Sequence, residues 1–127
     1  MFRVQQVKMH AGAGTHMDAP SHRIEGGKSI ADIPLEQLIA PSCVIDVSKK
    51  ADADYAISVA DIEQYEGDYG KIPPGALVIG YTGWSRFWSD PEAYRNLDGK
   101  GQMHFPAFSG KAAEFLLQRE IAGIAID

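Results

Sequence analysis

The sequence predicts an α/β protein in which a mixed β-sheet is flanked by helices. Short apolar segments rich in β-branched residues alternate along the chain with segments whose apolar residues recur at helical spacing, a pattern typical of α/β and α+β domains. With 127 residues, of which 45% are hydrophobic and 23% charged, the chain has the length and composition of one globular unit. We therefore expect a single domain over residues 1–127.

The first part of the chain contains two predicted strands and a short predicted helix. Residues 2–9, FRVQQVKM, alternate apolar and polar side chains imperfectly, which indicates a half-exposed strand. Residues 32–39, DIPLEQLI, carry Pro34 where a first helical turn tolerates it, so we expect a short helix there. Residues 43–48, CVIDVS, form a β-branched run that predicts a core strand in which Cys43 is buried and unreactive.

A helix and a strand are predicted in the middle of the chain. Residues 58–67 begin with Ser58 and carry Asp61 three positions later, which is the spacing of a capping box, and Gly67 is expected to end this helix. Residues 76–81, ALVIGY, form an apolar run after a Pro-Pro-Gly turn and predict a buried strand. This strand delivers the sequence TGW to an edge of the sheet.

The last part of the chain is predicted to be a loop, a helix and a strand. Residues 85–108 show little periodicity and predict a long ordered loop, of the kind that often carries function. Ser109 is a candidate cap for a helix over residues 110–121, and residues 123–127 predict a final core strand. The aromatic and histidine side chains that mark the loop are Trp88, Tyr94, His104 and Phe105.

Charge and hydropathy exclude several classes of partner. The net charge is −5 and Lys and Arg form no cluster, which argues against nucleic acid and against an anionic membrane. No apolar run approaches the roughly 18 residues of a membrane-spanning helix, and the amino end lacks a secretory signal, so we expect a cytoplasmic protein. Neither EGGKS nor GAGTHM completes a phosphate-binding or dinucleotide-binding motif. A small-molecule substrate or another protein chain is the expected partner.

Three of the four histidines lie within residues 10–22, HAGAGTHMDAPSH. His16 and Asp18 are two positions apart, so in an extended backbone an imidazole and a carboxylate point to the same side. This pair suits a divalent cation such as Zn²⁺ or Mn²⁺. Pro20 keeps the residue before it extended and places His22 near the pair. Because a catalytic zinc takes about three protein ligands, at least one more must come from elsewhere.

A purely structural interpretation of the same segment stays open. In it, Asp18 caps a turn and the histidines are solvent-facing loop residues. The concentration of histidines in one short segment favours a metal or acid–base site over this alternative.

The string GTHMDAPSH, residues 14–22, resembles the signature His-x-Gly-Thr-His-x-Asp-x-Pro-x-His of a family of metal-dependent, cyclase-like hydrolases. That family includes bacterial kynurenine formamidases and isatin hydrolases. The TGW sequence, the stretch FPAFSGKAAEFL and the closing IAGIAID are also similar to family features. The resemblance extends over nearly the whole chain from about residue 8.

The resemblance implies a function and a set of site residues. His16 and Asp18 would ligate Zn²⁺ or Mn²⁺, and His22 would be the catalytic acid–base residue. The substrates would be small molecules with an amide, formamide or lactam bond, as in an arylformamidase. Trp84 and the aromatic loop 87–105 could wall an apolar substrate pocket, although packing in the core explains them equally well. The implied fold is a swivelling β/β/α domain that assembles as a homo-oligomer, a dimer or tetramer.

The sequence departs from the family pattern at two places. The first histidine of the signature falls on Gly12, whereas His10 lies two residues earlier. In an extended strand these positions are about 6 to 7 Å apart, so His10 could act as the third metal ligand only after a local bulge or kink. Family members also begin before residue 2 and continue past Asp127, and they take a further His and Glu ligand from the later part.

Three functional hypotheses follow from these observations. The first is a metal-dependent amidohydrolase that lacks the family's carboxyl-terminal portion. The second is a catalytically inactive, truncated homologue that at most binds a metal or associates with a full-length partner. The third is a small-molecule binding module without enzymatic activity.

Overall fold

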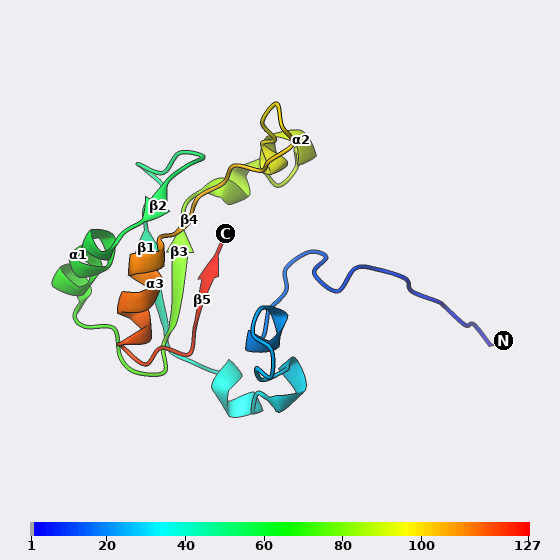
Figure 1. The fold of residues 1–127 in the computed structure, drawn as a ribbon, viewed down its shortest axis with the longest axis horizontal. Helices are drawn as coiled ribbons and strands as arrows, with labels where there is room; N and C mark the ends of the chain where they lie inside the picture. Colours follow the sequence, from blue (N-terminus) through cyan, green and yellow to red (C-terminus); the bar gives the residue numbers. More distant parts are fainter. Residues whose placement is uncertain (1) are drawn as a thin grey trace. The chain divides into compact units, whose positions relative to one another are not determined.

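The structure is a computed structural model that describes residues 2–127 (Figure 1). The chain divides into an amino-terminal unit that ends at Leu38 and a larger unit that spans Ile39–Asp127. Within the described residues, every α-helix and β-strand belongs to the larger unit, and the amino-terminal unit contains only short 3-10 helices. No helix in residues 2–127 has the length and apolar character needed to cross a membrane.

A three-stranded parallel sheet forms the centre of the larger unit. Its strands are β1 (Ser42–Asp46), β3 (Leu77–Tyr81) and β5 (Gly123–Ile126), in the spatial order β1-β3-β5. The register pairs Val44 with Ile79, and Ile79 with Ala125. All three predicted core strands are therefore confirmed, and so is the α/β class.

Two helices connect the strands of this sheet. Parallel neighbours cannot be joined by a tight turn and require a crossover connection. Helix α1 (Val59–Tyr69) lies between β1 and β3 along the chain, and helix α3 (Gly110–Leu117) lies between β3 and β5. Figure 1 shows both helices on the same face of the sheet, where they contact each other. The buried core between helices and sheet consists of Cys43, Ile45, Val47, Ile57, Ile62, Ile72, Ala76, Val78, Ala112 and Leu116.

Helix α1 begins at the predicted capping box and continues past its predicted end. The Ser58 side chain accepts a hydrogen bond from the Asp61 backbone N–H, and the Asp61 carboxylate accepts one from the Ser58 N–H. The prediction that Gly67 ends the helix is wrong, because an interior glycine only weakens a helix. The helix ends at Gly70, whose φ of 92° few other residues adopt and whose N–H donates to the Glu66 carbonyl.

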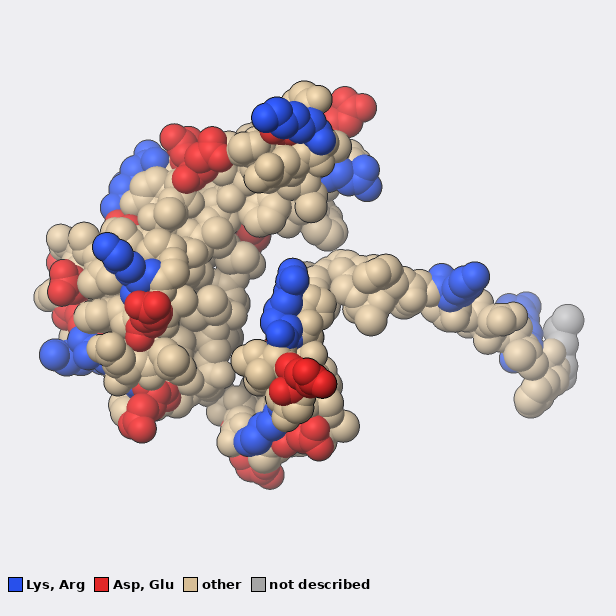
Figure 2. Space-filling model, in the orientation of Figure 1, with Lys and Arg blue, Asp and Glu red and all other residues tan. Residues whose placement is uncertain are grey.

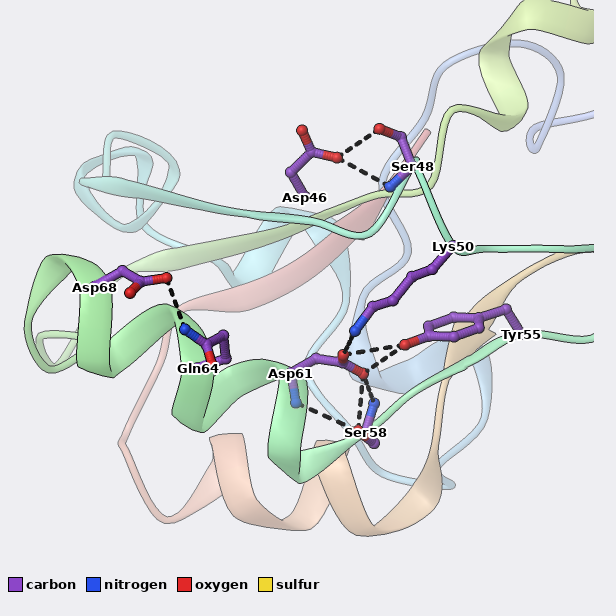
Figure 3. A network of polar contacts seen from close by, with 8 residues as sticks. All are labelled: Asp46, Ser48, Lys50, Tyr55, Ser58, Asp61, Gln64 and Asp68. Carbon is purple, nitrogen blue, oxygen red and sulfur yellow. Dashed lines mark hydrogen bonds and ion pairs between the residues drawn. The ribbon is translucent and has the colours of Figure 1, made fainter.

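The side chain of Asp61 is the centre of a buried polar network (Figure 3). It is 6% exposed and accepts hydrogen bonds from the Tyr55 hydroxyl at 3.0 Å and from the Ser58 N–H at 2.7 Å, and it forms an ion pair with Lys50. Burial raises the pKa of Asp61, but the hydrogen bonds from Lys50, Ser58 and Tyr55 together outweigh it and lower the pKa to about 2. The network fastens the segment after β1 to the start of α1.

The predicted loop over residues 85–108 contains more regular structure than its sequence indicates. It includes a 3-10 helix η4 (Trp84–Phe87), a short helix α2 (Pro91–Arg95) and a two-residue strand β4 (Ala107–Phe108). Strand β4 pairs in parallel with β2 (Ala56–Ile57) in a second small sheet. Strands of two residues are too short to produce a detectable alternation, which explains why neither was predicted.

Helix α3 is shorter than predicted. Ser109 caps it as expected, since its hydroxyl accepts from the Ala112 N–H at 3.1 Å. The helix ends at Leu117 rather than near residue 121. Glu120 adopts a φ of 54°, a left-handed conformation that is incompatible with further helix. The chain thus turns early and leads directly into β5.

The amino-terminal unit does not contain the predicted strand over residues 2–9. This segment is exposed and has no regular structure, because a strand needs a hydrogen-bonding neighbour and the described residues offer it none. Ala19 is the single buried residue in the described part of this unit.

The predicted helix over residues 32–39 is also replaced by smaller pieces. Two 3-10 helices are present, η2 (Ile30–Asp32) and η3 (Leu35–Leu38). Ile33 lies between them with φ −86° and ψ 117°, an extended conformation. The residue before a proline is disfavoured in the helical region, so Pro34 separates the two turns.

Charged side chains are mixed over the surface. On the face of the larger unit drawn in Figure 2, Lys and Arg side chains lie among Asp and Glu side chains, with uncharged surface between them.

We predict that Asp61→Asn lowers the free energy of unfolding at pH 7 by about 2 to 4 kcal/mol, because it removes the ion pair and weakens the helix cap. Urea denaturation measures this loss. The matched control is Asp68→Asn on the same helix, where the exposed carboxylate accepts a hydrogen bond from Gln64, and we expect less than about 0.5 kcal/mol there.

The pKa of Asp61 determines how the difference in unfolding free energy between wild type and Asp61→Asn depends on pH. A carboxyl whose pKa is lowered from 3.8 to about 2 on folding stabilises the protein above pH 3.8, and this stabilisation of about 2 kcal/mol is lost as the pH falls towards 2. The difference between wild type and Asp61→Asn should therefore shrink as the pH is lowered from 5 to 2. A difference that stays constant over this range would contradict the assigned ionisation.

Candidate functional site

The backbone before His16 forms a turn that orients its imidazole. The Ala13 N–H donates to the His10 carbonyl at 3.1 Å, and Gly14 adopts a φ of 72°. The Gly14 carbonyl lies 2.8 Å from His16 Nδ1. Since a carbonyl can only accept, Nδ1 carries the proton and the lone pair of the neutral ring is on Nε2. This is the arrangement by which proteins fix a histidine that binds a metal through Nε2.

Asp18 lies between two imidazoles. Its Oδ2 is 3.9 Å from His16 Nε2, and its Oδ1 is 3.6 Å from His22 Nδ1. The 3-10 helix η1 (Pro20–His22) begins after Ala19 and brings the His22 ring back towards Asp18. Ala19 has φ −91° and ψ 162°, the extended conformation that a residue before proline favours. The structure thus brings together the three side chains that the spacing of the sequence predicted to be neighbours.

His10 approaches the same place through the turn at residues 10–13. A methyl group built on Gly12 would lie 3.4 Å from His16 Nε2 and 3.8 Å from His10 Nδ1. Both rings therefore border the space above Gly12, which has no side chain to fill it. The backbone at residues 10–13 is therefore a turn and not an extended strand, and the role of His10 as a third ligand stays a prediction.

These side chains line one open pocket of about 460 Å³. The side chains of His22 and Asp18 are each 55% exposed, so both are accessible to water and to a small molecule. The lining residues are His10, Ala11, Gly12, His16, Met17, Asp18, Ala19, Ser21, His22 and Ile30.

The donor set fits a divalent metal in part. Two ligand atoms about 2 Å from one tetrahedral ion lie about 3.3 Å apart, so His16 Nε2 and Asp18 Oδ2, which are 3.9 Å apart, would have to close by about half an ångström to share one ion. In the described residues, no group of three or more His, Cys, Asp or Glu side chains is gathered closely enough to hold a metal. The residue types of the pair therefore suit a metal, but binding would require the pair to close slightly and a third ligand to move in.

His104 forms a second histidine–carboxylate cluster, in the larger unit. Its Nδ1 is 2.6 Å from Asp54 Oδ1, and its Nε2 is 3.7 Å from Asp98 Oδ2. The two ring nitrogens point in opposite directions, so the two carboxylates cannot share one ion with the ring. The hydrogen bond with Asp54 is the main reason why the pKa of His104 is raised. This cluster connects the segment around Asp98 to the loop before β2.

Trp84 is 7% exposed and packs inside the larger unit. Its indole N–H donates to the Tyr94 carbonyl at 3.0 Å, and its ring meets Phe87 edge to face at 4.9 Å between centroids. Trp88, by contrast, is 66% exposed and rests edge-on against the Tyr94 ring. A substrate-binding role for Trp84 stays a prediction.

Sequence reasoning missed the polar contacts at the carboxyl ends of the strands. Asp127 accepts hydrogen bonds from Thr82, and Asp46 accepts them from Ser48. A signal was present in the sequence, because each apolar strand ends in or is followed by a polar residue. The carboxyl ends of parallel strands gather at one edge of a sheet, so these polar residues could have been expected to lie near one another.

Comparisons with known proteins reveal related sequences. The sequence profile of the Cyclase family, described as "Putative cyclase", matches residues 2–127. An isatin hydrolase of Roseibium aggregatum is 37% identical over 118 residues, which covers 87% of this chain and 44% of that protein. A kynurenine formamidase of Bacillus cytotoxicus is 32% identical over 62 residues, which covers 49% of this chain and 28% of that protein.

Solved structures show the same relationship. Isatin hydrolase A from Ralstonia solanacearum matches with a TM-score of 0.79 and 34% identity, covering 86% of this chain and 44% of that chain. A potential metal-dependent hydrolase with cyclase activity matches with a TM-score of 0.70 and 27% identity, covering 96% of this chain and 51% of that one. The chain spans about half the length of these structures, or less. The profile match over residues 2–127 and the identity to the isatin hydrolase establish that this chain belongs to the Cyclase family.

Proposed function

We propose that this chain carries part of the metal site of a hydrolase that cleaves the amide, formamide or lactam bond of a small molecule. The observation that carries the proposal is the placement of Asp18 between His16 and His22, with the lone pair of His16 fixed on Nε2. Membership in a family whose relatives include an isatin hydrolase and a kynurenine formamidase supports the reaction class.

His16 and Asp18 would hold the metal, Zn²⁺ or Mn²⁺, and His10 would join them as the third ligand. When bound, the metal supplies a Lewis acid that polarises the scissile carbonyl and makes water a stronger nucleophile at neutral pH. The hydrogen bond to Gly14 keeps His16 in the tautomer that can donate its Nε2 lone pair. His and Asp ligands serve zinc and manganese alike.

His22 is the proposed acid–base residue. Its ring is exposed and held 3.6 Å from Asp18 through Nδ1, which leaves Nε2 to exchange protons with water and substrate. His22 would accept a proton from the attacking water and return one to the leaving nitrogen as the C–N bond breaks. The same proton transfers apply to an amide, a formamide and a lactam, which differ in the group attached to the carbonyl carbon.

The relatives favour a lactam among the three bond types. The isatin hydrolase shares more of this chain, at higher identity, than the kynurenine formamidase does. Isatin is a lactam fused to an aromatic ring, so opening of such a ring is the first reaction to test.

We predict that His22→Ala lowers kcat for isatin hydrolysis at least about a hundredfold, because it removes the group that transfers the proton. Loss of isatin absorbance in the metal-loaded protein measures the rate. The matched control is Glu25→Gln, an exposed carboxylate of the same unit that does not line the pocket, and it should retain wild-type activity.

Two results would overturn the proposed function. One is full activity after treatment with a chelator, which would remove the need for a metal. The other is stoichiometric metal binding without hydrolysis of isatin, of N-formylkynurenine or of a simple formanilide, which would favour the inactive homologue.

We also predict that His10→Ala weakens zinc binding about tenfold or more, since it removes a ligand from a small set. Competition with a chromophoric chelator measures the affinity. In the His10→Ala background, Gly12→His should restore binding, because it returns an imidazole to the position that the family signature uses. Lys8→Ala provides the control outside the pocket. An unchanged affinity in His10→Ala, with a loss in His16→Ala, would exclude His10 as a ligand.

A further inference from the structure

The carboxylate of Asp127 accepts three hydrogen bonds from one turn. Asp127 directly follows β5, and Thr82 directly follows β3, the strand beside it. Oδ1 of Asp127 accepts from the Thr82 backbone N–H and from the Thr82 hydroxyl, each at 2.7 Å, and Oδ2 accepts from the Ser85 N–H at 3.1 Å. Both oxygens are therefore directed at the turn formed by residues 82–85.

The same turn has little conformational freedom of its own. Gly83 adopts a φ of 74°, and a methyl group built on it would lie 3.2 Å from both Ser48 Cβ and the Arg86 guanidinium. Thr82 is 1% exposed, and its hydroxyl oxygen accepts a hydrogen bond from the Trp84 N–H at 3.2 Å while donating to Asp127. Thr82 thus links the carboxylate directly to the backbone of Trp84.

The position of Trp84 follows from this link. Its backbone N–H is held by Thr82, its indole N–H by the Tyr94 carbonyl, and its ring by Phe87. Trp84 is the first residue of η4 and directly follows Gly83. If the turn opened, Trp84 would lose its backbone hydrogen bond to Thr82 and would keep only the contacts of its side chain with Tyr94 and Phe87.

The ionised form of Asp127 is the one that the turn stabilises. Burial raises the pKa of Asp127, yet the hydrogen bonds from Thr82 and Ser85 together outweigh burial, so the pKa is lowered overall. A carboxylate that accepts several N–H and O–H groups cannot be replaced by an amide without turning one acceptor into a donor.

We propose that Asp127 is a positioning residue, whose carboxylate holds the Thr82–Ser85 turn closed and thereby sets the place of Trp84. The positioning of Trp84 is argued from hydrogen bonds within the larger unit alone. Its effect on the reaction rests in addition on the proposed function and on the prediction that Trp84 contacts the substrate. Asp127 itself touches no reacting group and acts through Thr82.

Fluorescence tests the positioning without any need for activity. The chain has two tryptophans, so Trp88→Phe leaves Trp84 as the only one. In that background we expect Asp127→Asn and Thr82→Val to make Trp84 severalfold more accessible to quenching by acrylamide, with a red-shifted emission and an unchanged circular dichroism spectrum. Thr82→Ser keeps the hydroxyl and should preserve the wild-type quenching.

A destabilised but correctly positioned variant is the control for general loss of stability. Asp61→Asn lies in a separate network and should lower the unfolding free energy without changing the quenching of Trp84 in the folded protein. If Asp127→Asn remains folded and Trp84 stays as protected as in the parent, Asp127 does not position Trp84 and the proposal is overturned.

Kinetics then tests the connection to substrate. In the metal-loaded protein, Asp127→Asn should raise KM for isatin about tenfold, which corresponds to about 1.4 kcal/mol, while kcat changes less than about threefold. Increased quenching with an unchanged KM would disprove the contact between Trp84 and substrate. If wild type and variant both fail to hydrolyse isatin, N-formylkynurenine and a simple formanilide, the proposed function fails, and the quenching measurement still decides the role of Asp127.

Discussion

The hydrogen bond between His16 Nδ1 and the Gly14 carbonyl is the interaction on which the rest of the site depends. It fixes the tautomer of His16, and its acceptor is the carbonyl of Gly14, which adopts a left-handed conformation. The adjoining turn at residues 10–13, closed by the hydrogen bond from the Ala13 N–H to the His10 carbonyl, places the His10 ring beside the space above Gly12. Two adjoining backbone features therefore orient the proposed ligand His16 and bring the proposed ligand His10 near it.

The larger unit is governed by a different constraint, the crossover connection of parallel strands. Helices α1 and α3 return the chain across one face of the sheet, which makes the three strands parallel. The carboxyl ends of all three strands therefore lie at the same edge. Polar residues at that edge, Asp46, Thr82 and Asp127, find partners in the loops that leave the strands. The Asp61 network connects the loop after β1 to the start of α1, so this loop is held by hydrogen bonds at both ends.

Local signals predicted much of the structure, and long-range contacts account for what was missed. The Ser58–Asp61 capping box and the grouping of His16, Asp18 and His22 depend on residues within one short segment, so the sequence alone was enough to predict them. The strand over residues 2–9 was predicted from alternation, but a strand also needs a partner that the pattern cannot supply. Thr82 and Asp127 are 45 positions apart, and no spacing rule relates them.

X-ray absorption at the zinc edge tests the central claim, that residues 10–22 supply metal ligands, most directly. For the zinc-loaded chain we expect nitrogen and oxygen ligands at about 2.0 to 2.2 Å, with outer-shell scattering from two imidazole rings. The imidazole contribution should fall by half in His10→Ala and in His16→Ala alike. A first shell of water oxygens without imidazole scattering, or a spectrum that neither substitution changes, would contradict a metal site built from His10, His16 and Asp18.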